Sequence, residues 1–335
     1  MKIVDFNTKR SPEDYYFPNI FISHEWLQII SETYQFKFYA VEKKGKIILP
    51  FCILGNGIEK IKSVPFGDYT FINYSNDLLI DALEFLKNQF TDKYIETTIV
   101  SNKPTQVNNF NLKPTGFLIQ VDVEEWRKSL VWKEAYERNI KNAINQGVEI
   151  NINQDINSID AFYQLHEQLR INKFRKLPQP LLFFKNIYNR LISTKKGFFL
   201  EAKLHGEVIA SWLIIKYDKV LYYKFGASNK NYLRYRPNDL LFRSLMQYAR
   251  DNGFKKVDLG FSGASKVYEG LIRFKSKEGG LKTPIFQMEY YPENFDFVKY
   301  GEYKDRLRKI TEDAIEQGDI NKIRTISNNM YGQFV

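Results

Sequence analysis

The sequence predicts an α/β protein of the α+β kind, with two domains followed by a helical tail. Its 335 residues exceed the roughly 150 residues of one typical domain, so two domains are expected. Both halves show a hairpin, a helix and strands, which indicates two similar domains. The hydrophobic fraction of 44% and the charged fraction of 26% are those of a globular protein. They exclude a disordered chain, a collagen-like fibre and a coiled-coil rod.

The first half opens with a helix and a hairpin. Ser23 is a good N-cap, so a helix is expected over 23–30. Two apolar runs between 36 and 54 flank Gly45, which predicts a hairpin with this glycine at its turn. The other elements expected in this half are an amphipathic helix over 77–90 and strands over 94–100 and 116–123.

The second half repeats this logic at greater length. A long helix is expected over 124–146, ended by Gly147. Pro237 opens a second helix, because proline is favoured at the first helical position. The remaining elements expected are helices over 159–173, 180–193 and 266–277, strands over 197–203, 207–217, 219–226, 256–259 and 283–290, and a polar helical segment over 293–329.

These patterns place the first domain at 1–125, the second at 126–292 and the tail at 293–335. In the second domain, two helices precede antiparallel strands, and helix, strand, helix and strand then alternate. This is the order of a GNAT-type acyltransferase fold, and the first domain reads as a degenerate copy of it. We therefore expect two tandem GNAT-like acyltransferase domains, with the helical tail packing back on the N-terminal domain.

Several function classes lose their main support. The sequence has no GxGxxG dinucleotide motif, no GxxxxGK[ST] phosphate loop and no GxSxG elbow. One cysteine and three histidines that lie far apart offer no metal-ligand spacing. No apolar stretch is long enough for a membrane helix, and the first residues contain no apolar segment typical of a signal peptide. A soluble, cytoplasmic protein without a metal is expected.

The chain is basic, with a formal net charge of +10. Such an excess favours anionic partners such as nucleic acid, nucleotide-linked substrates or an acidic membrane face, although a composition bias accounts for it equally well. The positive residues concentrate in two places, 170–176 and 266–282.

The start of the helix at Pro237 lacks the features of a coenzyme A site. An acetyl-CoA enzyme of this fold has a glycine-rich turn here, and its free N–H groups hold the pyrophosphate. Over 232–240 this chain has no glycine, Pro237 removes one donor, and Asp239 puts a carboxylate in the first turn. Because that carboxylate suits the helix dipole and repels a phosphate, we expect coenzyme A to bind weakly or not at all.

Several motifs in the second half form one pattern. The chain has Arg-x-x-x-x-Ala-x-x-x-Gly from Arg138 and His-x-x-x-Arg at 166–170. Gly-Ala-Ser at 226–228, Asp-x-Gly at 258–260 and Gly-Leu-x-x-Phe-Lys at 270–275 follow. This set resembles the FemAB-type peptidyltransferase family and its acetyltransferase relatives, which share a duplicated GNAT fold. The resemblance extends over roughly residues 130–285.

The resemblance implies an aminoacyl-tRNA donor, no cofactor and a catalytic role for Lys275. Lys275 stands at the Lys of the family's Phe-Lys motif, where it would touch the end of the donor and stabilise charge at the reacting carbonyl. The alternative is a solvated helix lysine. Because Gly279 and Gly280 follow closely, we expect the side chain to leave the packed face, so that Lys275→Ala has little effect on folding. If Lys275 stabilises the oxyanion, the same change lowers turnover roughly 10²-fold. Phe274 contributes to this site or packs in the core with Val267 and Leu271.

The other candidate residues would bind substrate. His166 is a general base by its ordinary pKa, or else a structural histidine. Arg170 and Arg138, with Lys141 beside Arg138 on one helix face, would bind phosphate or form surface ion pairs. We expect Asp258 to orient a neighbouring backbone group, and Tyr223, like Tyr222 and Tyr232, to stack on a base or a sugar.

Three functions are therefore open. The first is aminoacyl transfer from aminoacyl-tRNA to a UDP-linked or lipid-linked cell-envelope precursor, of peptidoglycan or another glycan. The second keeps the fold but takes its acyl group from acyl-CoA, and modifies a nucleotide sugar or exopolysaccharide. The third is a non-catalytic module that binds tRNA or glycan.

Overall fold

The chain folds into two compact units in a computed structural model that describes residues 1–6, 10–55, 58–72, 77–104, 106–129 and 133–334. Unit 1 comprises Met1–Phe117 and Thr283–Val335, and unit 2 comprises Leu118–Lys282. The last strand of the chain pairs with a strand of unit 1, which explains why unit 1 has two segments. The domain boundaries expected after residues 125 and 292 lie a few residues beyond the limits of these units and stay a prediction.

Unit 1 is a mostly antiparallel sheet covered by α2. The first hairpin turns at Lys44 and Gly45, which both have positive φ, as expected at that glycine. Strand β4 continues the antiparallel order, and the crossover through α2 then makes β6 parallel to β4. The elements of this unit are β1 (Lys2–Asp5), α1 (His24–Tyr34), β2 (Phe38–Lys43), β3 (Lys46–Leu54), β4 (Lys60–Lys62), β5 (Phe71–Ile72), α2 (Asp77–Gln89), β6 (Tyr94–Val100), the first part of β7 (Asn111–Asp122), most of β13 (Leu281–Tyr290), α9 (Phe297–Gln317) and α10 (Ile320–Met330).

The tail packs within unit 1. Gly318, with φ +68°, ends α9 and allows the turn into α10. The Tyr300 ring of α9 lies 5.7 Å from the Tyr94 ring, between centroids. Tyr331, just after α10, stacks on Tyr34 at 6.2 Å. Aromatic contacts therefore attach the end of the chain to the first half of the sequence.

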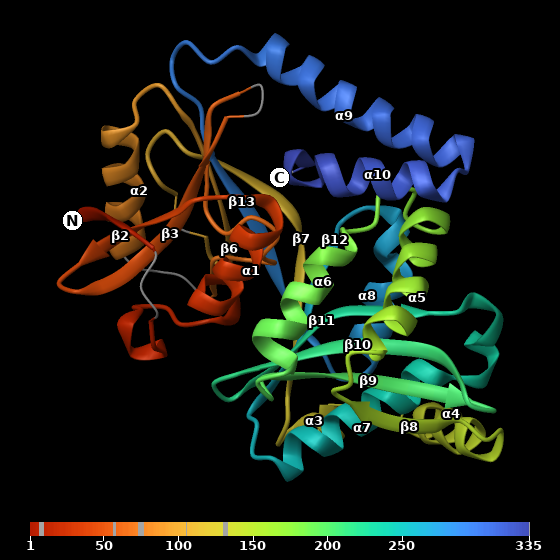
Figure 1. Ribbon diagram of the computed structural model, residues 1–335. Coiled ribbons are helices and arrows are strands. Elements are labelled where there is room, and N and C mark those ends of the chain that lie inside the picture. The colour runs from red at the N-terminus through yellow and green to blue at the C-terminus, as the bar shows by residue number, and fades with distance from the viewer. Residues whose placement is uncertain (7–9, 56–57, 73–76, 105, 130–132, 335) are drawn as a thin grey trace. The chain divides into compact units, whose positions relative to one another are not determined.

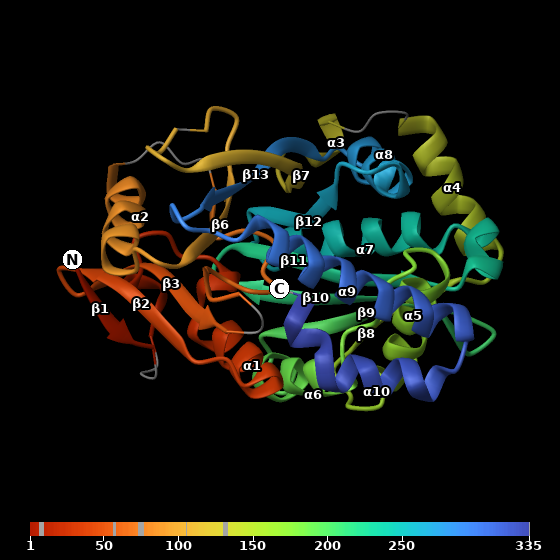
Figure 2. The same ribbon diagram turned by 90° about the horizontal axis from the view of Figure 1, so that it is seen from above.

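Unit 2 repeats the pattern of unit 1. Strands β8 to β11 are antiparallel neighbours, and the crossover through α7 makes β12 parallel to β11. Helices α5 and α6 lie on one face of these strands, while α4 and α7 lie on the other (Figures 1 and 2). The elements of this unit are the end of β7, α3 (Trp126–Ser129), α4 (Lys133–Asn145), β8 (Glu149–Asn153), α5 (Ser158–Asn172), α6 (Leu181–Ile187), β9 (Gly197–Leu204), β10 (Glu207–Tyr217), β11 (Val220–Ser228), α7 (Pro237–Asp251), β12 (Lys256–Gly263) and α8 (Glu269–Lys277).

Most elements occur where the sequence predicts them, but the short strands β1, β4 and β5 are not foreseen. Of the long helix expected over 124–146, the structure describes α3 (Trp126–Ser129) and α4 (Lys133–Asn145), and residues 130–132 between them lie outside the described residues. Strand β8 is not foreseen, since its residues, Glu-Ile-Asn-Ile-Asn, are mostly polar and exposed. It forms because β9 offers it an antiparallel partner.

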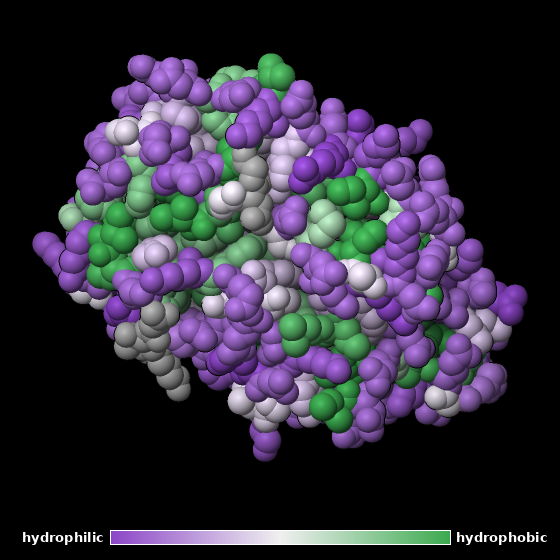
Figure 3. Space-filling view, turned by 45° about the horizontal axis from the view of Figure 1, so that its top comes forward, coloured by the Kyte–Doolittle hydropathy of each residue, from purple (hydrophilic) through white to green (hydrophobic). Residues whose placement is uncertain are grey.

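No helix in the described part of the chain is both long and apolar enough to cross a membrane. The face drawn in Figure 3 is mostly hydrophilic, with hydrophobic residues in separate patches.

Candidate functional site

The site in unit 2 begins where β11 and β12 stop pairing. Their parallel register covers only Val220–Tyr222 against Lys256–Asp258. Beyond these residues β11 continues on β10, with a bulge that leaves Lys224 unpaired opposite Leu213 and Ile214. The later residues of β12 instead receive hydrogen bonds from a side chain of α8.

That side chain is Lys275, which is only 2% exposed. Its Nζ donates to Ser262 Oγ at 3.0 Å and to the carbonyl oxygens of Gly260 and Phe261, both at 3.3 Å. The same nitrogen lies 5.7 Å from the centroid of the Tyr223 ring. The expectation of an exposed lysine is therefore wrong. Lys275 is a buried ammonium that oxygen atoms and an aromatic face hold in place.

Asp258 shapes the strand that receives this ammonium. Its side chain is buried, and Oδ1 accepts the backbone N–H of Gly260 at 2.8 Å. Oδ2 accepts from Gln120 Nε2 at 3.0 Å. Gly260 has φ +72°, a conformation that glycine adopts without strain. Asp258 therefore orients the backbone beside Lys275.

The Tyr223 ring beside the ammonium belongs to a cluster of three aromatic rings. Trp212 contacts Tyr223 at 4.6 Å and Phe274 at 6.4 Å, both edge to face. The Tyr223 hydroxyl lies so close to Gly226 that a Cβ at that position would come within 2.0 Å of it. Burial raises the pKa of Tyr223 above its ordinary value, so the phenol stays neutral.

Phe274 is only half-buried, and Val267 on the same stripe is 41% exposed. The apolar core stripe expected on α8 is therefore wrong. Among the residues of α8, Lys275 is the buried one. Phe274 lies beside the site rather than in the core.

The N-terminus of α7 is occupied by the protein's own charges. Asp239 is buried in the first turn and accepts from Lys277 Nζ at 2.7 Å. Glu278 is fully buried, and its carboxyl lies 3.5 Å from the same ammonium. Burial, together with the nearby Asp239 carboxylate, raises the pKa of Glu278 to about 9 against the effect of Lys277. Glu278 is therefore neutral near pH 7. Neither Lys277 nor Glu278 stands out in the sequence, because nothing there shows that α8 ends beside α7.

His166 is enclosed by aromatic rings. It stacks on Phe162 at 5.6 Å and lies 5.0 Å from Phe184, between centroids. Its Nε2 pairs with Gln179 Oε1 at 2.7 Å. Burial, helped by the charge of Arg170, lowers the pKa of His166 to about 3. The expectation of an ordinary pKa is therefore wrong, and the geometry is that of a structural, neutral imidazole.

The three candidate phosphate ligands are not brought together. Arg170 donates from Nε and Nη2 to one acceptor, the carbonyl oxygen of Leu177, at 3.1 and 3.0 Å. The guanidinium group of Arg170 therefore holds the loop after α5 in place. Arg138 and Lys141 lie exposed on α4.

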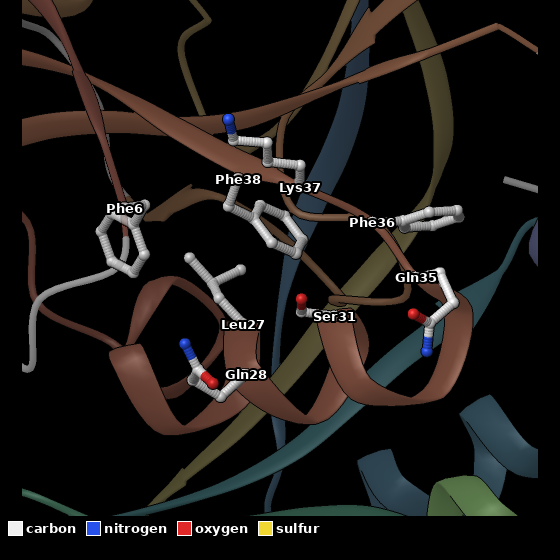
Figure 4. A pocket seen from close by; sticks show the side chains of 8 residues that line it. All are labelled: Phe6, Leu27, Gln28, Ser31, Gln35, Phe36, Lys37 and Phe38. Carbon is white, nitrogen blue, oxygen red and sulfur yellow. The ribbon is translucent and has the colours of Figure 1, made fainter.

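Unit 1 contains a separate cavity of about 190 Å³ (Figure 4). Phenylalanine side chains and α1 line it, and none of the predicted site residues takes part. The lining residues are Phe6, Leu27, Gln28, Ser31, Gln35, Phe36, Lys37 and Phe38. In the described part of the chain, no group of histidine, cysteine and acidic side chains is arranged to hold a metal ion.

Comparison with known proteins bears on the fold of the chain. Residues 133–275 match the family model of an acetyltransferase (GNAT) domain. The crystal structure of FemX is similar, with a TM-score of 0.65 and 14% identity, over 91% of this chain and 99% of FemX. L-PGS from Bacillus licheniformis gives a TM-score of 0.54 and 15% identity, over 78% and 85% of the two chains.

A third similar structure is the C-terminal domain of a putative lysylphosphatidylglycerol synthetase from Agrobacterium fabrum. Its TM-score is 0.52 and its identity 13%, over 72% of this chain and 81% of that one. No curated protein sequence matches. At these identities the solved structures show the fold. The predicted fold class, tandem GNAT-like domains with a helical tail, is confirmed.

Proposed function

Because the chain is a GNAT-type acyltransferase with the fold of FemX, we propose that it transfers an aminoacyl group from aminoacyl-tRNA. The acceptor is an amine of a UDP-linked or lipid-linked precursor of the cell envelope, in peptidoglycan or another glycan. The observation that carries the choice of donor is the N-terminus of α7. The Asp239 carboxylate lies there, paired with Lys277, where a coenzyme A pyrophosphate needs free N–H groups. The C-terminal domain of a putative lysylphosphatidylglycerol synthetase among the structural neighbours supports aminoacyl transfer.

The chemistry follows from the surroundings of Lys275. The acceptor nitrogen attacks the carbonyl carbon of the aminoacyl ester, a C–N bond forms, and the bond to the ribose oxygen breaks. The proton lost by the amine passes to that oxygen through solvent. The two 3.3 Å contacts of Lys275 are long, so one of its N–H groups can turn toward the developing oxyanion. His166 takes no part as a base, because it is enclosed and its pKa is lowered to about 3.

The test is a transfer assay with two labelled donors. One reaction contains a mixture of radiolabelled aminoacyl-tRNAs, and a second contains labelled acetyl-CoA. Both reactions contain UDP-linked and lipid-linked envelope precursors as acceptors. We expect label in the acceptor only from aminoacyl-tRNA, in a form that hydroxylamine does not remove, because an amide resists it and an ester does not. Transfer from neither donor would overturn the proposal and favour a non-catalytic module.

One observation favours acyl-CoA as the donor. The matching family model describes acetyltransferases, and modification of a nucleotide sugar or exopolysaccharide would follow from that donor. Calorimetry decides between the two donors. A micromolar or tighter dissociation constant for coenzyme A would put this second function first, whereas our proposal requires weak or absent binding.

A further inference from the structure

The loop after α5 is basic and is held in a fixed position. It contains Lys173, Arg175 and Lys176, whose side chains are all exposed. The Arg170 guanidinium binds the carbonyl of Leu177 at the end of the loop, and the Lys176 N–H binds the carbonyl of Arg170 at 3.0 Å. Arg175 has φ +51°, which a residue with a side chain adopts at a cost. Such a conformation persists only where the surrounding structure holds it.

A row of aromatic rings connects this loop with Lys275. Phe174 lies 5.3 Å from Tyr268, with the ring planes inclined by 31°, and Tyr268 lies 6.3 Å from Phe261. Tyr268 also packs over Gly263, where a Cβ would come within 3.0 Å of its ring. The carbonyl of Phe261 accepts a hydrogen bond from Lys275 Nζ. All three rings are half-buried, so part of each remains accessible.

Positively charged residues lie beside this row. Lys173 Nζ is 5.4 Å from the centroid of the Phe174 ring. Lys266 is exposed two residues before Tyr268. The first residue of α8 is acidic: Glu269, which is also exposed. Aromatic faces alternating with cations suit single-stranded nucleic acid, because bases stack on the rings while lysine and arginine contact phosphates.

We propose that the loop 173–176 and the segment 266–269 form the surface that binds the single-stranded 3′ end of an RNA donor. A base stacks on Phe174 and Tyr268, and the cations of the loop and Lys266 contact the adjacent phosphates. The 3′ end then follows the aromatic row to Lys275. This inference rests on the proposed function, since it assigns the donor of that same site to particular residues.

The test measures binding without any transfer reaction. Fluorescence anisotropy follows a labelled single-stranded RNA with the unpaired 3′ end of tRNA. In Phe174→Leu/Tyr268→Leu we expect a loss of affinity of roughly tenfold or more, from the loss of one stacked base. In Lys173→Ala/Arg175→Ala the slope of log affinity against log salt should fall by about 1.4, since each phosphate contact on a single strand contributes about 0.7. Glu269→Gln should strengthen binding.

The matched control is Lys195→Ala/Lys219→Ala. It removes the same charge from exposed positions at the opposite end of β9 to β11. Equal losses in the control and the loop variant would overturn the inference, because binding would then follow net charge alone. Binding that is unchanged in both site variants overturns it too and leaves the proposed donor standing. If the wild-type chain binds coenzyme A but no RNA, the proposed function itself fails.

Discussion

Replacing Lys275 with methionine tests the role of the buried ammonium. Methionine keeps most of the volume of the aliphatic part of the lysine side chain and removes the charge, so the backbone of β12 keeps its packing. The change leaves Ser262 Oγ and the carbonyls of Gly260 and Phe261 without this donor. Each costs about 1–3 kcal/mol if it stays unpaired. Removing a buried charge that is costly to desolvate offsets part of this loss.

We expect a net loss of about 1–3 kcal/mol in the free energy of unfolding, well below the 5–15 kcal/mol of a typical domain. The protein therefore stays folded, and turnover should fall roughly 10²–10³-fold, the usual effect of removing one oxyanion donor. The sequence alone predicts little effect on folding, because it places the side chain outside the packed face; a side chain that is 2% exposed predicts this loss instead.

The assay combines turnover at saturating donor with urea unfolding of the same preparation. Arg273→Ala is the control, since Arg273 is an exposed cation on the same helix. Its stability should stay within about 0.5 kcal/mol of wild type, and its turnover should be unchanged. If folded Lys275→Met works as fast as this control, Lys275 has no catalytic role.

Three further predictions concern the helix ends and the ring beside the site. Lys277→Ala removes the cation from two buried carboxyl groups, Asp239 and Glu278. The free energy of unfolding in urea should fall by about 2–4 kcal/mol, somewhat less than for a fully buried pair, because Lys277 is 29% exposed. A fall of less than about 0.5 kcal/mol would contradict the pairing. The pKa of Glu278 is raised to about 9, so the folded state keeps a proton that the unfolded state releases above its ordinary pKa of about 4.3. The free energy of unfolding should therefore fall as the pH rises from about 4.3 to about 9. Glu278→Gln should flatten this dependence on pH, and an unchanged slope would refute the raised pKa of Glu278. Gly226→Ala places a methyl group against the Tyr223 hydroxyl. Turnover should fall while the melting temperature changes little, and normal turnover would show that the position of the Tyr223 ring is unimportant.

The sequence predicts the order of elements well, because caps and turn glycines act locally. Ser23 accepts a hydrogen bond from Trp26 N at the start of α1, and Gly45 and Gly147 have the positive φ their turns require. The short strands β1, β4 and β5 are missed, and so is strand β8. Pairing to β9 creates the strand, and a polar sequence does not reveal that partner.

The site is predicted less completely, for a physical reason. The motifs that carry the family resemblance identify Lys275 and Asp258, and Tyr223 is a candidate as an aromatic residue; the fold brings these three to one place. The motifs do not reveal that Lys275 is buried or that His166 is enclosed by rings, since both depend on packing between distant segments. The pairing of Asp239 with Lys277 joins two helix ends that are 38 residues apart, and no local pattern predicts it.

The identity of the acyl donor is the central claim, and one competition experiment tests it most directly. The wild-type chain is loaded with labelled aminoacyl-tRNA, and transfer to the envelope precursor is followed while coenzyme A is added in large excess. With Asp239 and Lys277 occupying the start of α7, transfer should continue at the same rate. Inhibition by micromolar coenzyme A, with transfer of label from acetyl-CoA in the parallel reaction, would contradict the account.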